Sequence, residues 1–141
     1  MSFVMTAEER QEFLAGVHVG VVAVGRAGRA PLATPVWYGY SPGGDVLIWT
    51  DRGTLRERLF REAGRFSLCV QTETVPYKYV TVEGPVVEID RAPTSEEALA
   101  ITARYLPADE AEQWVENNLG AEALLVRMRP EKWLSTDYGK A

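Results

Sequence analysis

The feature that most constrains the fold is a series of three strand-like runs joined by short turns, with no helical segment between them. The runs cover residues 17–24, 31–40 and 46–50, and they are separated by the turn sequences Gly25–Ala30 and Ser41–Asp45. β-Branched and apolar runs favour strands, and clusters of Gly, Pro and Asp favour turns. We therefore expect an antiparallel meander at the start of the chain. Consecutive strands without intervening helices argue against a doubly wound α/β fold.

Further strands and four short helices complete the predicted fold. The later strands are expected at residues 65–71, 77–89 and 121–128, with an extended segment at 130–135 and a bulge or bend at Gly84-Pro85. The helices are expected at residues 6–14, 54–63, 92–105 and 107–120. Six strands with helices at the edges indicate a mainly β fold with peripheral helices, a small antiparallel β-barrel. No linker or repeat interrupts residues 1–141, so we expect a single domain.

Composition excludes several classes of protein. The chain is 46% hydrophobic and 25% charged, which is typical of a globular domain, and its net charge of −5 argues against a general nucleic-acid binder. No hydrophobic run reaches membrane-spanning length, and no signal-peptide pattern is present at the N-terminus. We therefore expect a cytoplasmic protein without membrane or nucleic-acid partners.

Single cysteine and histidine residues limit the chemistry that the chain carries. Cys69 is the only cysteine, so neither an intrachain disulfide nor a Cys-based metal site is expected. Its apolar neighbours predict a buried strand position. His18 is the only histidine, has no metal-ligating residue beside it, and is interpreted as a strand residue. No triad, paired-carboxylate or metal-ligand spacing stands out, so a reaction here would depend on a cofactor.

Basic residues concentrate where a strand ends and a helix begins. Thr54 is a good N-cap, and Glu57 follows at the spacing of a capping box. Arg52, Arg56 and Arg58 surround this first turn, where the helix dipole already favours an anion. One interpretation is a seat for a phosphate or carboxylate; the other is a capped surface helix with solvated arginines. The segment alone leaves both open.

Aromatic residues recur on the predicted strands and also allow two interpretations. They either pack against one another across neighbouring strands or line the binding site of a flat conjugated ring. They are Trp37, Tyr38, Trp49, Tyr77, Tyr79 and Trp133.

Four local motifs, taken in order, resemble the flavin-binding split β-barrel of the pyridoxamine 5′-phosphate oxidase-like superfamily. They are Ala33–Tyr38, Thr50–Arg56, Tyr77–Gly84 and Arg129–Ser135. The chain looks closest to the actinobacterial branch that uses the deazaflavin coenzyme F420, and FMN-binding members share the layout. The resemblance implies a six-stranded antiparallel split β-barrel that forms a homodimer with its cofactors at the interface.

The resemblance also implies which residues bind the cofactor. Thr54 and Arg56 match the pair that holds the phosphate, with Arg52 and Arg58 as auxiliaries and Leu55 within the same motif. The remaining expected contacts are Thr34, Pro35, Val36 and Trp37 along the ring, Thr50 between ring and phosphate, and Tyr77, Lys78, Tyr79 and Trp133 toward the cofactor of the other subunit. The Thr54 hydroxyl is expected to turn its proton to the phosphate while its lone pair caps the helix.

The function implied is hydride transfer from reduced F420 to a conjugated small-molecule acceptor. Alternatives are an FMN-dependent enzyme of the same fold, a non-catalytic flavin- or haem-binding carrier, and a purely structural barrel. No match is found to the Arg and His residues that hold pyridoxal phosphate in the founding oxidase, so vitamin B6 oxidation is not expected. No single residue is assigned a catalytic role.

Overall fold

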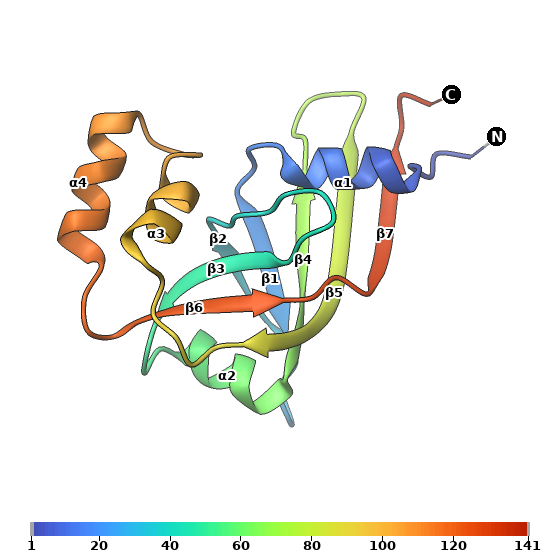
Figure 1. The fold of residues 1–141 in the computed structure, drawn as a ribbon. Coiled ribbons are helices and arrows are strands. Elements are labelled where there is room, and N and C mark those ends of the chain that lie inside the picture. The colour runs from blue at the N-terminus through green and yellow to red at the C-terminus, as the bar shows by residue number, and fades with distance from the viewer. Residues whose placement is uncertain (1, 141) are drawn as a thin grey trace.

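The protein, seen in a computed structural model that describes residues 2–140, is a split β-barrel with four helices at its edges (Figure 1). All the predicted helices and strands form, and the extended segment near the C-terminus is a seventh strand. In chain order the elements are α1 (Ala7–Ala15), β1 (Gly20–Val24), β2 (Leu32–Val36), β3 (Val46–Asp51), α2 (Leu55–Ala63), β4 (Arg65–Gln71), β5 (Lys78–Glu88), α3 (Ser95–Thr102), α4 (Ala108–Asn118), β6 (Ala123–Met128) and β7 (Lys132–Asp137).

The pairing of the strands corrects the predicted meander. The strand order is β2-β1-β4-β5-β6-β3, with β7 pairing to β5. Of the first three strands, only β1 and β2 pair as a hairpin, whereas β3 pairs with β6 and meets the end of the second run through one bridge, Gly39 to Leu47. The connection differs because Tyr38 and Tyr40 are buried in the core, at 0% and 6% exposure. The chain therefore crosses the barrel before β3 begins, and β3 becomes an edge strand.

The long strand β5 joins the two halves of the barrel. Its first part pairs with β4 and β7, and its last part pairs with β6 after a register shift between Val86 and Glu88. The bend predicted at Gly84-Pro85 is thus present, with its irregularity a few residues further on. Gly84 has a packing reason to be glycine, because a Cβ there would overlap the carbonyl oxygen of Arg129. Figure 1 shows β5 curving from one sheet toward the other.

Alternation along β4 separates the core from an outer face. Phe66, Leu68 and Val70 are buried, while Cys69 between them is only partly buried. The prediction that Cys69 is buried is therefore wrong, because the two-residue period of a strand turns it to the other face. His18 also differs from its prediction, since it precedes β1 rather than lying within it.

Two helical units position the candidate site. Helix α2 begins at the N-cap Thr54 and ends at Gly64, whose φ of 70° is a left-handed C-cap conformation suited to glycine. The α3–α4 pair lies beside the edge strand β3, on the side away from β7 (Figure 1). The edge strand thus runs between α2 at its end and the two helices along its outer face.

Candidate functional site

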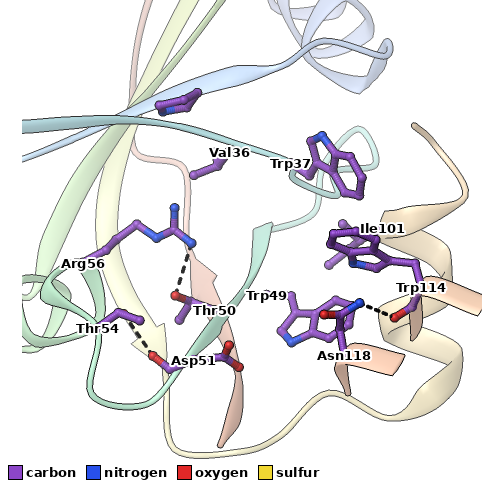
Figure 2. Close-up of a pocket in the computed structure, with 11 residues that line it drawn as sticks. Val36, Trp37, Trp49, Thr50, Asp51, Thr54, Arg56, Ile101, Trp114 and Asn118 are labelled. Atoms are coloured by element: carbon purple, nitrogen blue, oxygen red, sulfur yellow. Dashed lines mark hydrogen bonds between the residues drawn. The ribbon is translucent and has the colours of Figure 1, made fainter. Parts of the chain in front are cut away.

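A pocket of about 320 Å³ lies where β3, the end of β2, the first turn of α2 and the α3–α4 pair meet (Figure 2). This volume falls in the range of small-molecule sites. The residues that line it are Pro35, Val36, Trp37, Trp49, Thr50, Asp51, Thr54, Arg56, Ile101, Trp114 and Asn118. Six of the residues predicted to bind cofactor are among them: Pro35, Val36, Trp37, Thr50, Thr54 and Arg56.

The edge strand β3 divides the pocket into two sides. Its alternating pattern buries Thr50, at 3% exposure, and leaves Trp49 and Asp51 on the opposite, more open face. Figure 2 shows Arg56 and Thr50 on one side, and Trp37, Trp114 and Trp49 along the other. One side is therefore cationic and the other aromatic.

The guanidinium of Arg56 is the central charge of the cationic side. Its Nη2 donates a hydrogen bond to Thr50 Oγ1 at 3.2 Å, and its buried Nε has no partner among residues 2–140. Burial lowers the pKa of Arg56, and the nearby negative charge of Asp51 opposes that shift. Arginine stays protonated in proteins, so the side chain is a partly desolvated cation with an unused donor. This environment suits an anionic group.

The N-cap at Thr54 differs in two ways from the prediction. Its Oγ1 accepts from the backbone N–H of Glu57 at 3.2 Å, but the Glu57 carboxylate accepts from Gly53 N–H at 2.9 Å rather than from Thr54 N–H. Only half of the predicted capping box is present. The Thr54 hydroxyl proton is directed to the carbonyl oxygen of Asp51, at 3.0 Å, rather than to a phosphate position.

The neighbouring residues of the basic segment do not line the pocket. Arg52 forms a loose ion pair with Glu122, at 3.8 Å, and its side chain is 54% exposed. Arg58 is exposed, and so is Leu55, at 42%. Their predicted contacts with a cofactor stay predictions, and Arg56 is the arginine that the fold turns into the cavity.

The strand β2 contributes one wall of the pocket, although Thr34 does not line the cavity. Its Oγ1 is buried without a hydrogen-bond partner among the described residues. Just beyond the strand, Trp37 stacks on Tyr105, with ring centroids 5.0 Å apart and planes 5° from parallel. This stacking holds one face of the Trp37 indole in place.

The residues predicted to reach the other subunit lie away from this pocket. Tyr77 precedes β5, Lys78 and Tyr79 begin it, and Trp133 is on β7. The Lys78 ammonium is 4.0 Å from Asp137, and the Arg10 guanidinium lies 4.9 Å from the Trp133 ring centroid. Their predicted contact with a partner's cofactor stays a prediction.

The structure adds residues that the sequence interpretation missed. Ile101 on α3, and Trp114 and Asn118 on α4, line the pocket together with Asp51. The four-residue spacing of Trp114 and Asn118 places both on one helical face, but nothing in the sequence connects that face to β3. Trp49 had been recognised only as one aromatic among several.

Residues 2–140 show neither a metal-binding cluster nor a membrane-spanning helix. That part of the chain holds no group of three or more His, Cys, Asp or Glu side chains placed to bind a metal ion. It also contains no helix with the length and apolar character needed to cross a bilayer.

The split barrel carries a pocket with a cationic side and an aromatic side. The sequence model described as pyridoxamine 5′-phosphate oxidase matches residues 6–133. The chain therefore belongs to this family, as its motifs predicted. No curated protein matches the sequence at a significant level.

Solved structures share the fold at low sequence identity. The conserved hypothetical protein Rv2991 from Mycobacterium tuberculosis is 22% identical, with a TM-score of 0.80 over 97% of this chain and 88% of that one. A protein described as an F420 reductase is 18% identical, with a TM-score of 0.65 over 88% and 94%. An FAD-binding protein from Mesorhizobium loti is 22% identical, with a TM-score of 0.63 over 93% and 91%. These likenesses show the split-barrel fold.

Proposed function

We propose that the protein is an oxidoreductase that uses reduced coenzyme F420 to transfer a hydride to a conjugated small-molecule acceptor. The observation that carries the proposal is the Arg56 side chain, a partly buried cation that lines the pocket and makes one hydrogen bond, to the neutral hydroxyl of Thr50. Membership of the family and the shared fold with an F420 reductase support the same choice.

The residues present fit a ligand with a phosphate at one end and a flat ring at the other. A guanidinium with a free donor is the group best suited to a phosphate oxygen. Pro35, Val36 and Trp37 offer backbone and apolar contacts for a ring beside β2. The unpaired hydroxyl of Thr34 is a further orphaned polar atom on this strand. Arg56 and Thr50 are the residues that would hold the phosphate end.

The chain's own contribution to such a reaction is positioning and charge. The chemistry that F420 supplies when bound and reduced is the hydride. The indoles of Trp37, Trp49 and Trp114 exclude water from one side of the pocket. Holding two reactants in contact in a water-poor site lowers the barrier by fixing their orientation. No proton donor is assigned, and solvent supplies the proton in this proposal.

We further propose that two copies assemble through the outer face of the sheet. The register aligns a row across five strands, in the order Pro35, Val21, Cys69, Thr81, Leu134. Val21 is 42% exposed and Leu134 60%, so this face presents apolar side chains to solvent. Pro35 belongs both to this row and to the pocket. Burying the row would therefore place the pocket beside the interface.

The cofactor is tested by purification from a host that makes FMN but not F420. We expect a colourless protein that quenches the fluorescence of added F420 at micromolar concentration and then reduces a panel of enones and quinones. A yellow preparation with bound FMN would favour the FMN-dependent alternative. Tight binding without turnover across the panel would favour a carrier.

The assembly is tested by light scattering after chromatography. The double variant Val21→Lys, Leu134→Lys places two charges in the proposed interface and is expected to be monomeric. Val87→Lys is the matched control, since Val87 is also exposed, at 44%, but lies outside the row. A wild-type monomer, or a double variant that stays dimeric, would contradict the proposed interface.

A further inference from the structure

Three of the four tryptophans of the chain line the same pocket, and they come from separate parts of the fold. Trp37 follows β2, Trp49 lies on β3 and Trp114 lies on α4. The Trp37 and Trp114 ring centroids are 5.6 Å apart, with planes inclined by 50°. Figure 2 shows the three indoles along one side of the cavity, opposite Arg56.

The packing of the barrel leaves part of the surface of each of these indoles exposed. Trp114 is 44% exposed although it is among the largest apolar side chains of the protein. Trp37 has one face covered by Tyr105, and Trp49 is only partly buried. Aromatic faces left open beside a cavity are surfaces on which a flat ring can stack.

The polar groups at this side of the pocket are hydrogen-bond acceptors. Asp51 shares the open face of β3 with Trp49, and its carboxylate makes no ion pair within 4.0 Å in the described part of the chain. The side-chain amide of Asn118 donates to the carbonyl oxygen of Trp114 at 2.9 Å, which leaves its own oxygen free to accept. Figure 2 shows Asp51 between Thr54 and Trp49, with Asn118 close to Trp49.

We propose that Trp37, Trp49, Trp114 and Asp51 form a subsite for a flat conjugated ring that carries a positive charge or N–H donors on its edge. Indole faces attract cations through their quadrupole, and the effect strengthens where water is partly excluded. The carboxylate adds attraction for the same charge and repels an anionic ring. The subsite is chemically opposite to the Arg56 side. It requires no particular cofactor, but it shares Trp37 with the wall that the proposed function gives to the cofactor ring.

The test is a fluorescence titration with three probes that share one ring and differ in charge. The probes are 1-methylnicotinamide, nicotinamide and nicotinate, which are cationic, neutral and anionic at neutral pH. Quenching of tryptophan emission by the cation is expected to saturate, with affinity falling in the order cation, neutral ring, anion. Linear quenching by all three probes, or nicotinate binding as tightly as the cation, would overturn the proposal.

Variants assign the binding to the named side chains. Trp114→Leu is expected to weaken binding of the cation by about tenfold, the change typical of one lost cation–π contact. Asp51→Asn should abolish the preference for cation over neutral ring. Tyr138→Leu removes an exposed aromatic ring that does not line the pocket and should leave the titration midpoint unchanged. Wild-type midpoints in both Trp114→Leu and Asp51→Asn would exclude the subsite, whichever cofactor the protein uses.

Discussion

The first and last turns of α2 each carry an arginine, and the two differ in how their charge is used. Arg61, in the last turn, forms contacts with Glu57 at 2.8 Å and Asp90 at 2.7 Å, which raise its pKa. Arg56, in the first turn, makes one hydrogen bond to a neutral hydroxyl, and burial lowers its pKa. Arg61 is satisfied by the protein itself, whereas Arg56 is left with a donor for a ligand.

This difference shows that the arginines of the basic segment do not share one role. Arg52, Arg56, Arg58 and Arg61 lie within ten residues, yet only Arg56 lines the pocket. The distinction depends on which carboxylates the fold brings near each arginine, and Asp90 comes from beyond β5. Mutations in the two turns should therefore have separate effects on binding and on stability.

The largest expected effect is on ligand affinity. Arg56→Ala should weaken F420 binding by about 1.5–3 kcal/mol, because a charge-assisted hydrogen bond to a phosphate is lost. Arg61→Ala, on the same helix, should leave the affinity unchanged. Both are measured by equilibrium titration of F420 fluorescence. Equal losses of affinity in the two variants would contradict the claim that Arg56, and not Arg61, binds the ligand.

Stability should show the reverse pattern. The Glu57 carboxylate is 6% exposed and accepts from both Gly53 N–H and Arg61. Glu57→Ala should lower the free energy of unfolding in urea by about 1–3 kcal/mol, because both donors lose their partner. Arg56→Ala should be neutral or stabilising, since it removes a buried, unsatisfied donor. A large loss of stability in Arg56→Ala would show that its role is structural.

The N-cap should contribute less than the Glu57 network. Thr54→Ala removes the acceptor for Glu57 N–H and should cost about 1 kcal/mol in the free energy of unfolding. Thr54→Ser keeps the hydroxyl and should retain most of that stability in the same urea experiment. If the alanine and serine variants unfold at the same midpoint, the hydroxyl does not cap the helix.

The smallest expected effect is a pH dependence of the free energy of unfolding, caused by His18, which lies outside α2. Burial lowers the pKa of His18, and the Phe13 carbonyl beside it opposes that shift. The unfolded chain therefore binds this proton more readily, so stability should rise with pH toward about 6.5 and be complete above it. This pH-dependent contribution should be absent in His18→Gln. Urea midpoints between pH 5 and 8 measure it, and an unchanged slope in the variant would contradict it.

Local signals predicted much of the fold. Thr6 with Glu9 forms the predicted capping box, and Gly64 ends α2 as expected. The pairing of β3 with β6 was not predictable in the same way, because it joins segments far apart in the chain and depends on how Tyr38 and Tyr40 fill the core. The short turns predicted a three-stranded meander, but packing between distant segments determines which strand pairs with β3.

The candidate site also has one part that the sequence predicts and one part that it does not. Thr50 and Arg56 lie in one motif next to a helix start, so the cationic side was accessible from sequence. Trp114 reaches the pocket only because α3 lies against the edge strand β3 and α4 packs on α3. Its position four residues before Asn118 indicates a shared helical face, but not what that face meets.

The most direct test of the central claim is a crystal structure with F420 bound. We predict that the phosphate lies in the pocket and accepts hydrogen bonds at about 2.7–2.9 Å from the Arg56 guanidinium. A phosphate held instead by Arg52 or Arg58 on the surface, with no contact to Arg56, would contradict the proposed site.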